Sequence, residues 1–284
     1  MILKGIGKLV RKFPHVPGVD FSGVVEKSNS AQFSEGDRVV LNGWRVGEAH
    51  WGGYSQKARV NSQWLVHVPD NFTNAHAMGI GTAGYTAMLA ISALEKNGLS
   101  VENEGEVLVT GAAGGVGSIA VAILSSLGYR VTASTGREEA GKYLIDLGAT
   151  AIISRKELEE EISSPLSSQR WSGVIDNVGG VILGNVLGSI NYHGACAAVG
   201  NTNSNTSEIN ILPFLLRGIS IFGIDSVLCP LDKRIEAWKR LSQALPIEKL
   251  SNIMEIKPLS QIMEHADKIL SGSVRGRVVI DVNS

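Results

Sequence analysis

Residues 108–121, LVTGAAGGVGSIAV, place four glycines between a short β-branched run and a longer apolar stretch of helical spacing. Gly111 follows the run EVLVT, which is typical of a buried strand, and the other three glycines stand where the next helix begins. Missing side chains let a backbone approach a pyrophosphate closely, and the N–H groups at a helix N-terminus favour negative charge. Glycine clusters also form ordinary tight turns, but the order of strand, glycine turn and helix favours a dinucleotide-binding site here.

The same order of strand, turn and helix continues along the chain. Short apolar runs of the buried-strand type recur, separated by segments long enough to contain a crossover helix. These runs are EVLVTG, YRVTAST, AIIS, GVIDNVGG, GACAAVG and ISIFGID. The alternation predicts an α/β fold with a doubly wound parallel sheet that helices cover on both faces.

The two ends of the chain follow other patterns. Between Val16 and Pro69 the sequence reads as short strands broken by glycine and proline, VPGVDFSGVVEKS, EGDRVVLNGW, GGYSQKARV and QWLVHVP, which indicates a small β-barrel unit. A long helix is expected to follow, with Thr73 as its N-cap and Gly98 at its end. The tail predicts two helices, LDKRIEAWKRLSQAL and LSQIMEHADKILSG, and a final strand, RGRVVIDV.

Composition limits the class of partner. The chain has 284 residues, 44% of them hydrophobic, and a formal net charge of -1 from 26 basic and 27 acidic residues. Two domains fit this length, and near-neutral charge favours a small-molecule substrate over nucleic acid or a membrane. Cys196 and Cys229 lie too far apart in the sequence for a metal motif or a disulfide framework. Without a secretory signal or a run of about 18 apolar residues, a soluble, cytoplasmic protein is expected.

The end of the second strand of the parallel sheet indicates which dinucleotide binds. A site that prefers NAD places Asp or Glu there, to accept hydrogen bonds from the ribose 2′-hydroxyl. The sequence is VTASTGREE, in which Thr135 and Gly136 are small and Arg137 can pair with a 2′-phosphate, so we predict NADPH as the cofactor. In the alternative interpretation Arg137 is a solvated residue and Glu138 supplies the acid. Arg155, just after the third strand, could reach the same phosphate, flank the adenine or lie at the surface.

Five stretches together resemble the medium-chain dehydrogenase/reductase family. They are PGVDFSG (17–23), GWRVGEAHWGG (43–53), IGTAGYTAM (80–88), TGAAGGVGS (110–118) and GIDSV (223–227). The chain is most similar to the zinc-free, quinone-oxidoreductase-like branch and, within it, to the YhdH/YhfP group, which includes NADPH-dependent acryloyl-CoA reductase. The resemblance implies a GroES-like β-barrel substrate domain at 1–75, a Rossmann NADPH-binding domain at 76–228 and a segment, 229–284, that returns to the substrate domain. It also implies a homodimer.

The resemblance assigns cofactor contacts position by position. They are Ala113, Gly114, Gly115, Val116, Thr135, Gly136, Arg137, Arg155, Asn201, Leu215, Ser226 and Arg277. For Asn201 and Ser226 the sequence pattern agrees, because ligands bind beyond the carboxyl ends of parallel strands. Leu215 and Arg277 rest on the resemblance alone, with a core leucine and a surface arginine as the alternatives.

The reaction that the resemblance implies is reduction of an activated carbon–carbon double bond, with acryloyl-CoA converted into propanoyl-CoA by hydride transfer to the β carbon. No metal is expected, because the six histidines are scattered and neither cysteine lies in the N-terminal part. One alternative is an NADPH quinone or enone oxidoreductase. Another is a protein that binds NADPH without catalysis, because family members begin with a further N-terminal segment that borders the active site. If that segment is missing, the barrel is incomplete and exposes a strand edge.

Five side chains are candidates for the substrate side. They are Asp20, Arg45, His50, Trp51 and Tyr85. Asp20 is more typical of a structural turn, while His50 and Tyr85 could each either face the substrate or pack in the fold. No catalytic residue is assigned, because solvent could protonate the enolate that hydride transfer produces.

Overall fold

The computed structural model describes residues 2–6, 10–103, 105–160 and 164–284, and it divides into two compact units. Unit 1 comprises Met1–Tyr85, Ser226–Gln243 and Ile247–Ser284, while unit 2 comprises Thr86–Asp225 and Ala244–Pro246. Unit 1 is thus built from both ends of the chain, and unit 2 largely from its middle.

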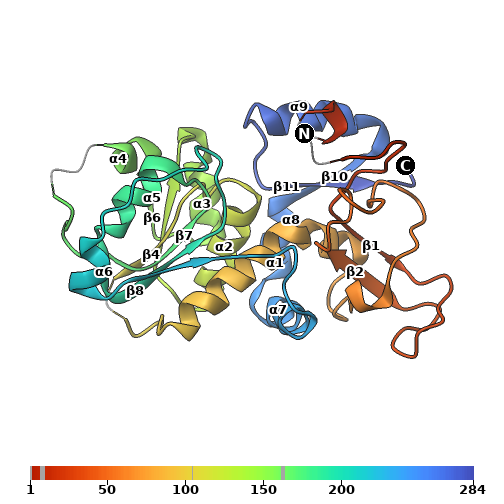
Figure 1. Ribbon diagram of the computed structural model, residues 1–284, viewed down its shortest axis with the longest axis horizontal. Coiled ribbons are helices and arrows are strands. Elements are labelled where there is room, and N and C mark those ends of the chain that lie inside the picture. Colours follow the sequence, from red (N-terminus) through yellow and green to blue (C-terminus); the bar gives the residue numbers. More distant parts are fainter. Residues whose placement is uncertain (1, 7–9, 104, 161–163) are drawn as a thin grey trace. The chain divides into compact units, whose positions relative to one another are not determined.

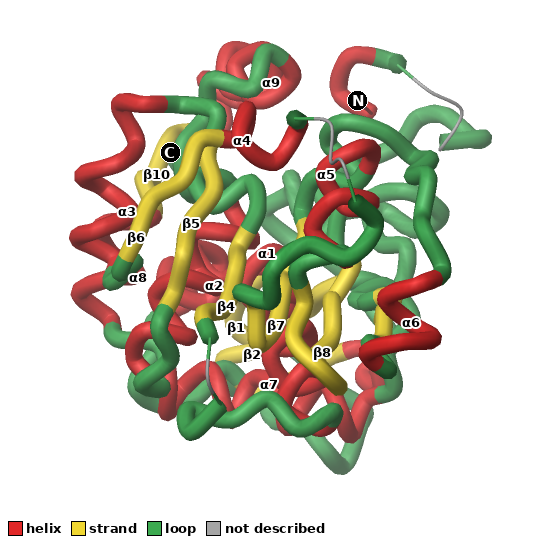
Figure 2. Tube along the Cα trace, turned by 90° about the vertical axis from the view of Figure 1, so that its left-hand side faces the viewer, coloured by secondary structure: helices red, strands yellow, loops and turns green. Residues whose placement is uncertain are grey.

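Unit 2 contains a six-stranded parallel sheet in the order β6-β5-β4-β7-β8-β9. The strands are β4 (Glu106–Val109), β5 (Val131–Thr135), β6 (Ala151–Ser154), β7 (Trp171–Asp176), β8 (Ile190–Ala198) and β9 (Ser220–Gly223). Figure 2 shows β6, β5, β4, β7 and β8 side by side. Each strand overlaps one of the apolar runs, so the predicted doubly wound parallel sheet is confirmed.

The strand order reverses direction at β4. The chain runs from β4 to β5 and β6 on one side, and from β7 to β8 and β9 on the other. Right-handed crossovers place α2 (Gly115–Ser126) and α3 (Gly141–Leu147) on one face and α5 (Gly180–Leu187) on the other. Figure 1 shows helices on both sides of this sheet. The carboxyl ends of β4 and β7 therefore form the switch point at which sheets of this kind bind ligands.

The core of unit 2 explains its long apolar runs. Every residue of β5 and β7 is buried, and so are the residues of α2 from Gly117 to Leu124. Val174 of β7, Cys196 of β8 and Ile182 of α5 belong to one buried cluster. Shorter helices complete the unit, namely η3 (Glu138–Ala140), α4 (Arg155–Glu159) and α6 (Leu212–Arg217). Because both faces are covered, the strands need no polar alternation.

Unit 1 contains two small sheets. One is antiparallel, in the order β1-β2-β3, and the other is a parallel pair, β10-β11. The strands are β1 (Asp20–Val24), β2 (Arg38–Asn42), β3 (Leu65–His67), β10 (Met254–Pro258) and β11 (Arg277–Asp281). The strand expected in GGYSQKARV, residues 52–60, is wrong. The N–H groups of Gly52, Gly53 and Tyr54 bond instead to carbonyl groups of residues 16–18, in an irregular turn rather than a ladder.

The C-terminal part of the chain supplies most of the helices of unit 1. They are α7 (Leu231–Ala244), α8 (Ile247–Ile253) and α9 (Ile262–Leu270), with the short turn η4 (Leu259–Gln261). The N-terminal part adds the short turns η1 (Ile2–Lys4) and η2 (Ser62–Trp64). The tail predicts α7, α9 and β11 correctly but misses α8 and β10. α8 has only 7 residues, too few to show a helical period, and β10 depends on pairing with β11.

The predicted long helix is α1 (Asn74–Lys96), and the Thr73 hydroxyl caps it by accepting a bond from the His76 N–H at 3.1 Å. The helix is broken at Gly81, where φ is 49° and ψ is -157°. It has 23 residues and contains an 18-residue window with a mean hydropathy of 1.4, so it is the one helix in the described part of the chain long and apolar enough to cross a membrane. The expectation of no such stretch therefore needs correction. Since 72% of its apolar window is buried, α1 has the burial of a core helix.

Candidate functional site

The glycine turn between β4 and α2 has the shape that a pyrophosphate site requires. Gly111 has a φ of 57°, a conformation that side chains disfavour. Gly114 is the N-cap of α2, and no side chain caps the helix there, so the turn ends in main-chain N–H groups. A Cβ on Gly117 would lie 2.5 Å from the carbonyl oxygen of Gly111, so glycine is needed for α2 to pack against the turn. The predicted contacts Ala113, Gly114, Gly115 and Val116 all lie in this turn or in the first residues of α2.

The end of β5 carries basic rather than acidic side chains. β5 ends at Thr135, whose hydroxyl accepts a hydrogen bond from the Arg137 N–H at 3.1 Å. The Arg155 guanidinium lies over the next residue, because a Cβ on Gly136 would be 3.0 Å from its Cζ. Arg155 also pairs with Glu159, at 3.2 Å between Nε and Oε1. The structure thus brings Arg155, from the start of α4, onto the turn that carries Arg137.

Asp176, at the end of β7, is a functional candidate that the sequence analysis did not single out. Its carboxylate is fully buried and accepts hydrogen bonds from the Thr110 hydroxyl at 2.6 Å and from the Gly179 N–H at 2.8 Å. Burial raises the pKa of Asp176 above its usual value, although these hydrogen bonds act in the opposite direction. The Asn177 side chain donates to the Thr110 carbonyl at 2.7 Å. Together they tie the carboxyl ends of β4 and β7 at the switch point, and the Asp-Asn pair after an apolar run is the signal that could have found them.

Two more predicted contacts lie in unit 2. Asn201 follows the carboxyl end of β8, and its side-chain amide donates to the Asn205 carboxamide oxygen. Leu215 lies in α6 and is 70% exposed, so the alternative of a core leucine is wrong. Both positions are open to a ligand, and their contact with the cofactor stays a prediction.

The last two predicted contacts, Ser226 and Arg277, belong to unit 1. Arg277 begins β11, and its Nε donates to the Gly79 carbonyl at 3.1 Å. The guanidinium packs on the kink of α1, because a Cβ on Gly81 would lie 2.6 Å from Nη2 of Arg277. Arg277 is therefore half-buried and anchored at the kink, which does not fit the alternative of a plain surface arginine.

An acid and a phenol accompany Arg277 in unit 1. Asp20 accepts a hydrogen bond from the Thr82 N–H at 2.6 Å, just after the kink of α1. Burial raises the pKa of the Tyr54 hydroxyl, the Asp20 carboxylate raises it further, and Arg277 opposes the change. Asp20 thus has a structural role at the start of the second part of α1, but it is the first residue of β1 and not the turn residue that the sequence favoured. Tyr54 stays protonated at neutral pH.

The other substrate-side candidates divide into exposed and packed groups. Trp51 is 69% exposed, and Arg45, with a φ of 57°, has a largely exposed side chain that lies 3.6 Å from Glu48. His50 packs against the Trp64 ring, with 4.8 Å between the ring centres. Tyr85 is fully buried, so it packs in the fold and does not face a substrate.

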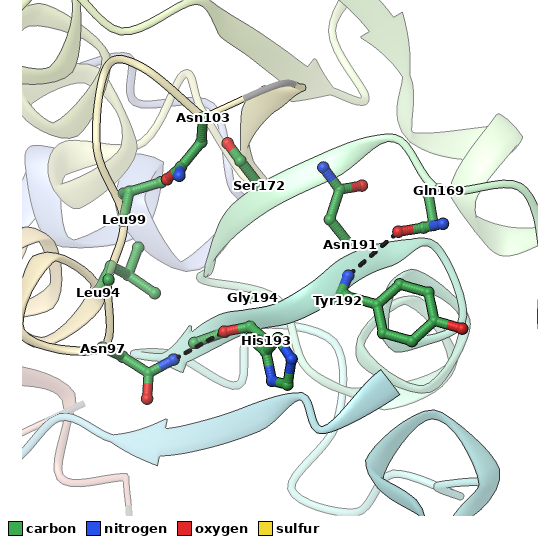
Figure 3. A pocket seen from close by; sticks show the side chains of 12 residues that line it. Leu94, Asn97, Leu99, Asn103, Gln169, Ser172, Asn191, Tyr192, His193 and Gly194 are labelled. Atoms are coloured by element: carbon green, nitrogen blue, oxygen red, sulfur yellow. Dashed lines mark hydrogen bonds between the residues drawn. The ribbon is translucent and has the colours of Figure 1, made fainter. Parts of the chain in front are cut away.

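A polar cavity of about 320 Å³ lies in unit 2, at the amino ends of β7 and β8. Figure 3 shows its lining, with Asn97 and Asn103 on one side and Asn191 and Gln169 on the other. The Asn97 side chain donates to the His193 carbonyl at 3.1 Å. Because ligands of open parallel sheets bind at the carboxyl ends, this cavity is not the candidate cofactor site.

The donor groups in the described part of the chain do not suit a zinc ion. Within the described ranges, no group of three or more His, Cys, Asp or Glu side chains lies together in a way that could hold a metal. Cys196 and Cys229 are both buried, and burial raises the pKa of the Cys196 thiol well above its usual value. A thiol that keeps its proton is a poor metal ligand.

Two family models match the chain. The model described as the alcohol dehydrogenase GroES-like domain matches residues 1–70, and the model described as zinc-binding dehydrogenase matches residues 115–244. The first lies in unit 1, and the second covers most of the parallel sheet of unit 2.

Individual relatives resemble the chain over nearly its whole length. Acrylyl-CoA reductase AcuI of Ruegeria pomeroyi is 52% identical over 278 residues, which covers 98% of this chain and 84% of the relative. The yhdH oxidoreductase from Salmonella enterica, solved in complex with NADP, has a TM-score of 0.95 and 44% identity, covering 99% of this chain and 86% of that one. Bacillus subtilis yhfP, solved with NAD bound, has a TM-score of 0.93 and 43% identity, covering 96% and 83%.

Proposed function

The chain belongs to the medium-chain dehydrogenase/reductase family, and on this premise we propose that it is an NADPH-dependent, zinc-independent reductase of activated carbon–carbon double bonds. The proposed substrate is acryloyl-CoA, which accepts a hydride at its β carbon and a proton at its α carbon to give propanoyl-CoA. The identity of 52% to an acrylyl-CoA reductase supports this choice. The chain is accordingly an oxidoreductase that acts on a small molecule.

The basic turn after β5 is the observation that supports NADPH as the cofactor. Thr135 and Gly136 leave room for a phosphate, and Arg155 lies over Gly136 while Arg137 follows it. Charge-assisted hydrogen bonds from guanidinium groups to a phosphate are roughly twice as strong as neutral ones, whereas a carboxylate at this point would repel it. The turn therefore fits the 2′-phosphate that distinguishes NADPH from NADH.

The remaining contacts follow from the same binding mode. Ala113 to Val116 would hold the pyrophosphate at the N-terminus of α2, where main-chain N–H groups and the helix dipole favour an anion. Asn201, Leu215, Ser226 and Arg277 complete the proposed set of cofactor contacts. The exposure of Leu215 supports its part in it.

NADPH, when bound, supplies the hydride, so the chain's own task is to orient the nicotinamide and the double bond and to exclude water. Negative charge develops on the thioester oxygen as the hydride adds, and fixed N–H groups or a cation would stabilise it. Of the substrate-side candidates, Arg45 and Trp51 are exposed enough to meet the substrate, whereas Tyr85 is excluded by its burial. The proton for the α carbon can come from solvent.

The reaction is tested by following NADPH oxidation with acryloyl-CoA and identifying propanoyl-CoA by mass spectrometry. A competing quinone in the same assay distinguishes the first alternative, because a quinone reductase would consume NADPH without forming propanoyl-CoA. Tight NADPH binding with no turnover of acryloyl-CoA, an enone or a quinone would instead indicate the non-catalytic alternative.

The cofactor is tested separately by Arg137→Ala. Loss of the guanidinium should raise the dissociation constant of NADPH by about tenfold and leave that of NADH nearly unchanged. Isothermal titration with both dinucleotides measures this. Equal losses for the two would refute the assignment of Arg137 to the 2′-phosphate.

We also propose a homodimer in the cytoplasm. β9 is an edge strand of the six-stranded sheet, and edge strands present main-chain groups that can pair with another chain. Its half-buried residues Ile221 and Phe222 offer an apolar edge for such pairing.

A further inference from the structure

Arg234, in α7, is a fully buried cation that holds two distant pieces of unit 1. Its Nη1 donates to the carbonyl oxygen of Asn42, directly at the end of β2, at 2.5 Å. Its Nη2 lies 3.4 Å from the carbonyl oxygen of Ser226, 3.3 Å from that of Val227 and 3.2 Å from that of Cys229. One side chain thus reaches main-chain acceptors in the turn after β2 and in the segment 226–229.

Aromatic rings complete the surroundings of this guanidinium. Its Cζ lies 4.9 Å from the ring centre of Trp44 and 4.9 Å from that of Tyr85. Cation–π contacts of this kind offset part of the cost of burying a charge. The Trp238 indole, on the next turn of α7, donates to Oδ1 of Asn42 at 3.0 Å. A planar group with five N–H donors suits this arrangement, whereas a lysine ammonium has only three.

The two pieces that Arg234 holds also touch each other directly. The Trp44 N–H donates to the carbonyl oxygen of Val227 at 2.8 Å. A Cβ on Gly43 would lie 2.6 Å from that same oxygen, so only glycine allows the approach. The position of segment 226–229 therefore depends on the turn at 42–44 and on the guanidinium that donates to both.

Segment 226–229 follows β9 along the chain, and this position indicates which half of NADPH, adenosine or nicotinamide, the segment contacts. The basic turn for the 2′-phosphate lies after β5, on one side of the switch point, so the adenosine half belongs to the β5 and β6 side. The nicotinamide half then belongs to the side of β7, β8 and β9. Ser226, as a proposed cofactor contact after β9, is accordingly assigned to the nicotinamide end.

We propose that Arg234 is a positioning residue that fixes segment 226–229 so that Ser226 can meet the nicotinamide end of NADPH. Arg234 acts through the main chain and does not itself touch the cofactor. The inference rests on the proposed function, because it takes NADPH as the cofactor and Ser226 as one of its contacts.

The experiment compares two ligands that share the adenosine half. NADPH carries the nicotinamide, and 2′,5′-ADP lacks it but keeps the 2′-phosphate. Isothermal titration is done with the full chain and with Arg234→Met, Arg234→Lys and the control Lys233→Met, which changes an exposed neighbour on α7 in the same way. Arg234→Met should raise the dissociation constant of NADPH by about tenfold and leave that of 2′,5′-ADP within about twofold. Arg234→Lys should show a smaller loss for NADPH, and the control none.

Each result decides the matter. Unchanged NADPH binding in a folded Arg234→Met variant would overturn the inference, and so would equal loss of both ligands, since this would report general damage. If Arg234→Met does not fold, Arg234→Lys keeps the charge but lacks the fork of donors, and the same comparison applies to it. A wild-type chain that binds neither ligand would overturn the proposed cofactor itself, and with it the inference.

Discussion

Gly136 should affect cofactor binding because the guanidinium of Arg155 lies on it. Alanine fits its backbone, since φ there is outside the left-handed region, but the new Cβ would be 3.0 Å from Cζ of Arg155 and 3.2 Å from its Nε. We therefore expect Gly136→Ala to displace the guanidinium and to weaken NADPH binding by about threefold to tenfold, with NADH binding and thermal stability unchanged.

A double-mutant cycle checks this cause. In an Arg155→Ala background the guanidinium is already gone, so Gly136→Ala should add no further loss of NADPH affinity. Additive losses in the double variant would mean that the methyl group meets the phosphate itself and not Arg155.

Single residues also show where sequence reasoning ends. The basic turn at Thr135, Gly136 and Arg137 could be read from the sequence, because its residues are adjacent and follow a recognisable strand. The hydrogen-bond partners of Asp176 and Arg234 could not, because they lie far along the chain. The Thr110 partner of Asp176 is 66 positions away, and the Asn42 partner of Arg234 is 192 positions away.

At the scale of elements, the contact between α2 and the glycine turn depends on Gly117. A Cβ there would lie 2.5 Å from the Gly111 carbonyl oxygen and 2.6 Å from Cα of Ala112, both of them backbone atoms that cannot move cheaply. We expect Gly117→Ala to lower the free energy of unfolding by about 1–3 kcal/mol, as overpacking of a close contact does. Thermal and urea denaturation measure the change.

Gly114→Ala serves as the matched control for this variant. A Cβ on Gly114 has the Gly111 carbonyl oxygen as its nearest neighbour, at 3.3 Å, so stability should change little. NADPH binding should fall nevertheless, because the methyl group would project into the proposed pyrophosphate site. Equal destabilisation by the two variants would contradict the packing argument.

The hydrogen bond from Thr110 to Asp176, which joins the ends of β4 and β7, predicts that the stability of the fold depends on pH. Because burial raises the pKa of Asp176 above the usual value of 3.8, its protonated form stabilises the fold. This contribution is fully present below the usual pKa and is lost as the pH rises through the raised one. Asp176→Asn does not titrate, so the melting temperature of the wild type minus that of the variant should shrink as the pH increases through this range. Thermal denaturation across a pH series measures it.

Thr110→Val sharpens this test. The Thr110 hydroxyl donates to Asp176 and lowers its pKa, so its removal should move the loss of stability to higher pH. A difference between wild type and Asp176→Asn that grows with pH would contradict the direction of the shift.

Elements were predictable where burial alone defines them. β5 and β7, in the parallel sheet, are short and fully buried, so their apolar runs mark them without help from neighbours. Residues 52–60 and β10 depend on pairing partners that no local pattern reveals. The break at Gly81 was missed because the alanine-rich stretch around it reads as one helix, whereas Asp20 and Arg277 impose the kink from outside.

At the scale of the whole molecule, the proposed dimer can be measured directly. One chain has a mass of 30.2 kDa, and light scattering should give about twice this mass. Phe222→Asp would place a charge on the edge strand β9, and charged edges prevent strand pairing, so this variant should have the mass of a single chain. A wild-type mass of one chain would refute the dimer.

Unit 1 is assembled from both ends of the chain, and this has a consequence for biosynthesis. The turn at Asn42 leaves the ribosome long before its partner Arg234, whereas the strands of unit 2 all emerge in between. The nucleotide-binding sheet can therefore close while the protein is still being made. The first eighty or so residues lack most of their core until the final helices are translated, so they cannot fold before then. Premature termination near residue 225 should accordingly leave a folded sheet attached to an unfolded leader, which a protease would remove first.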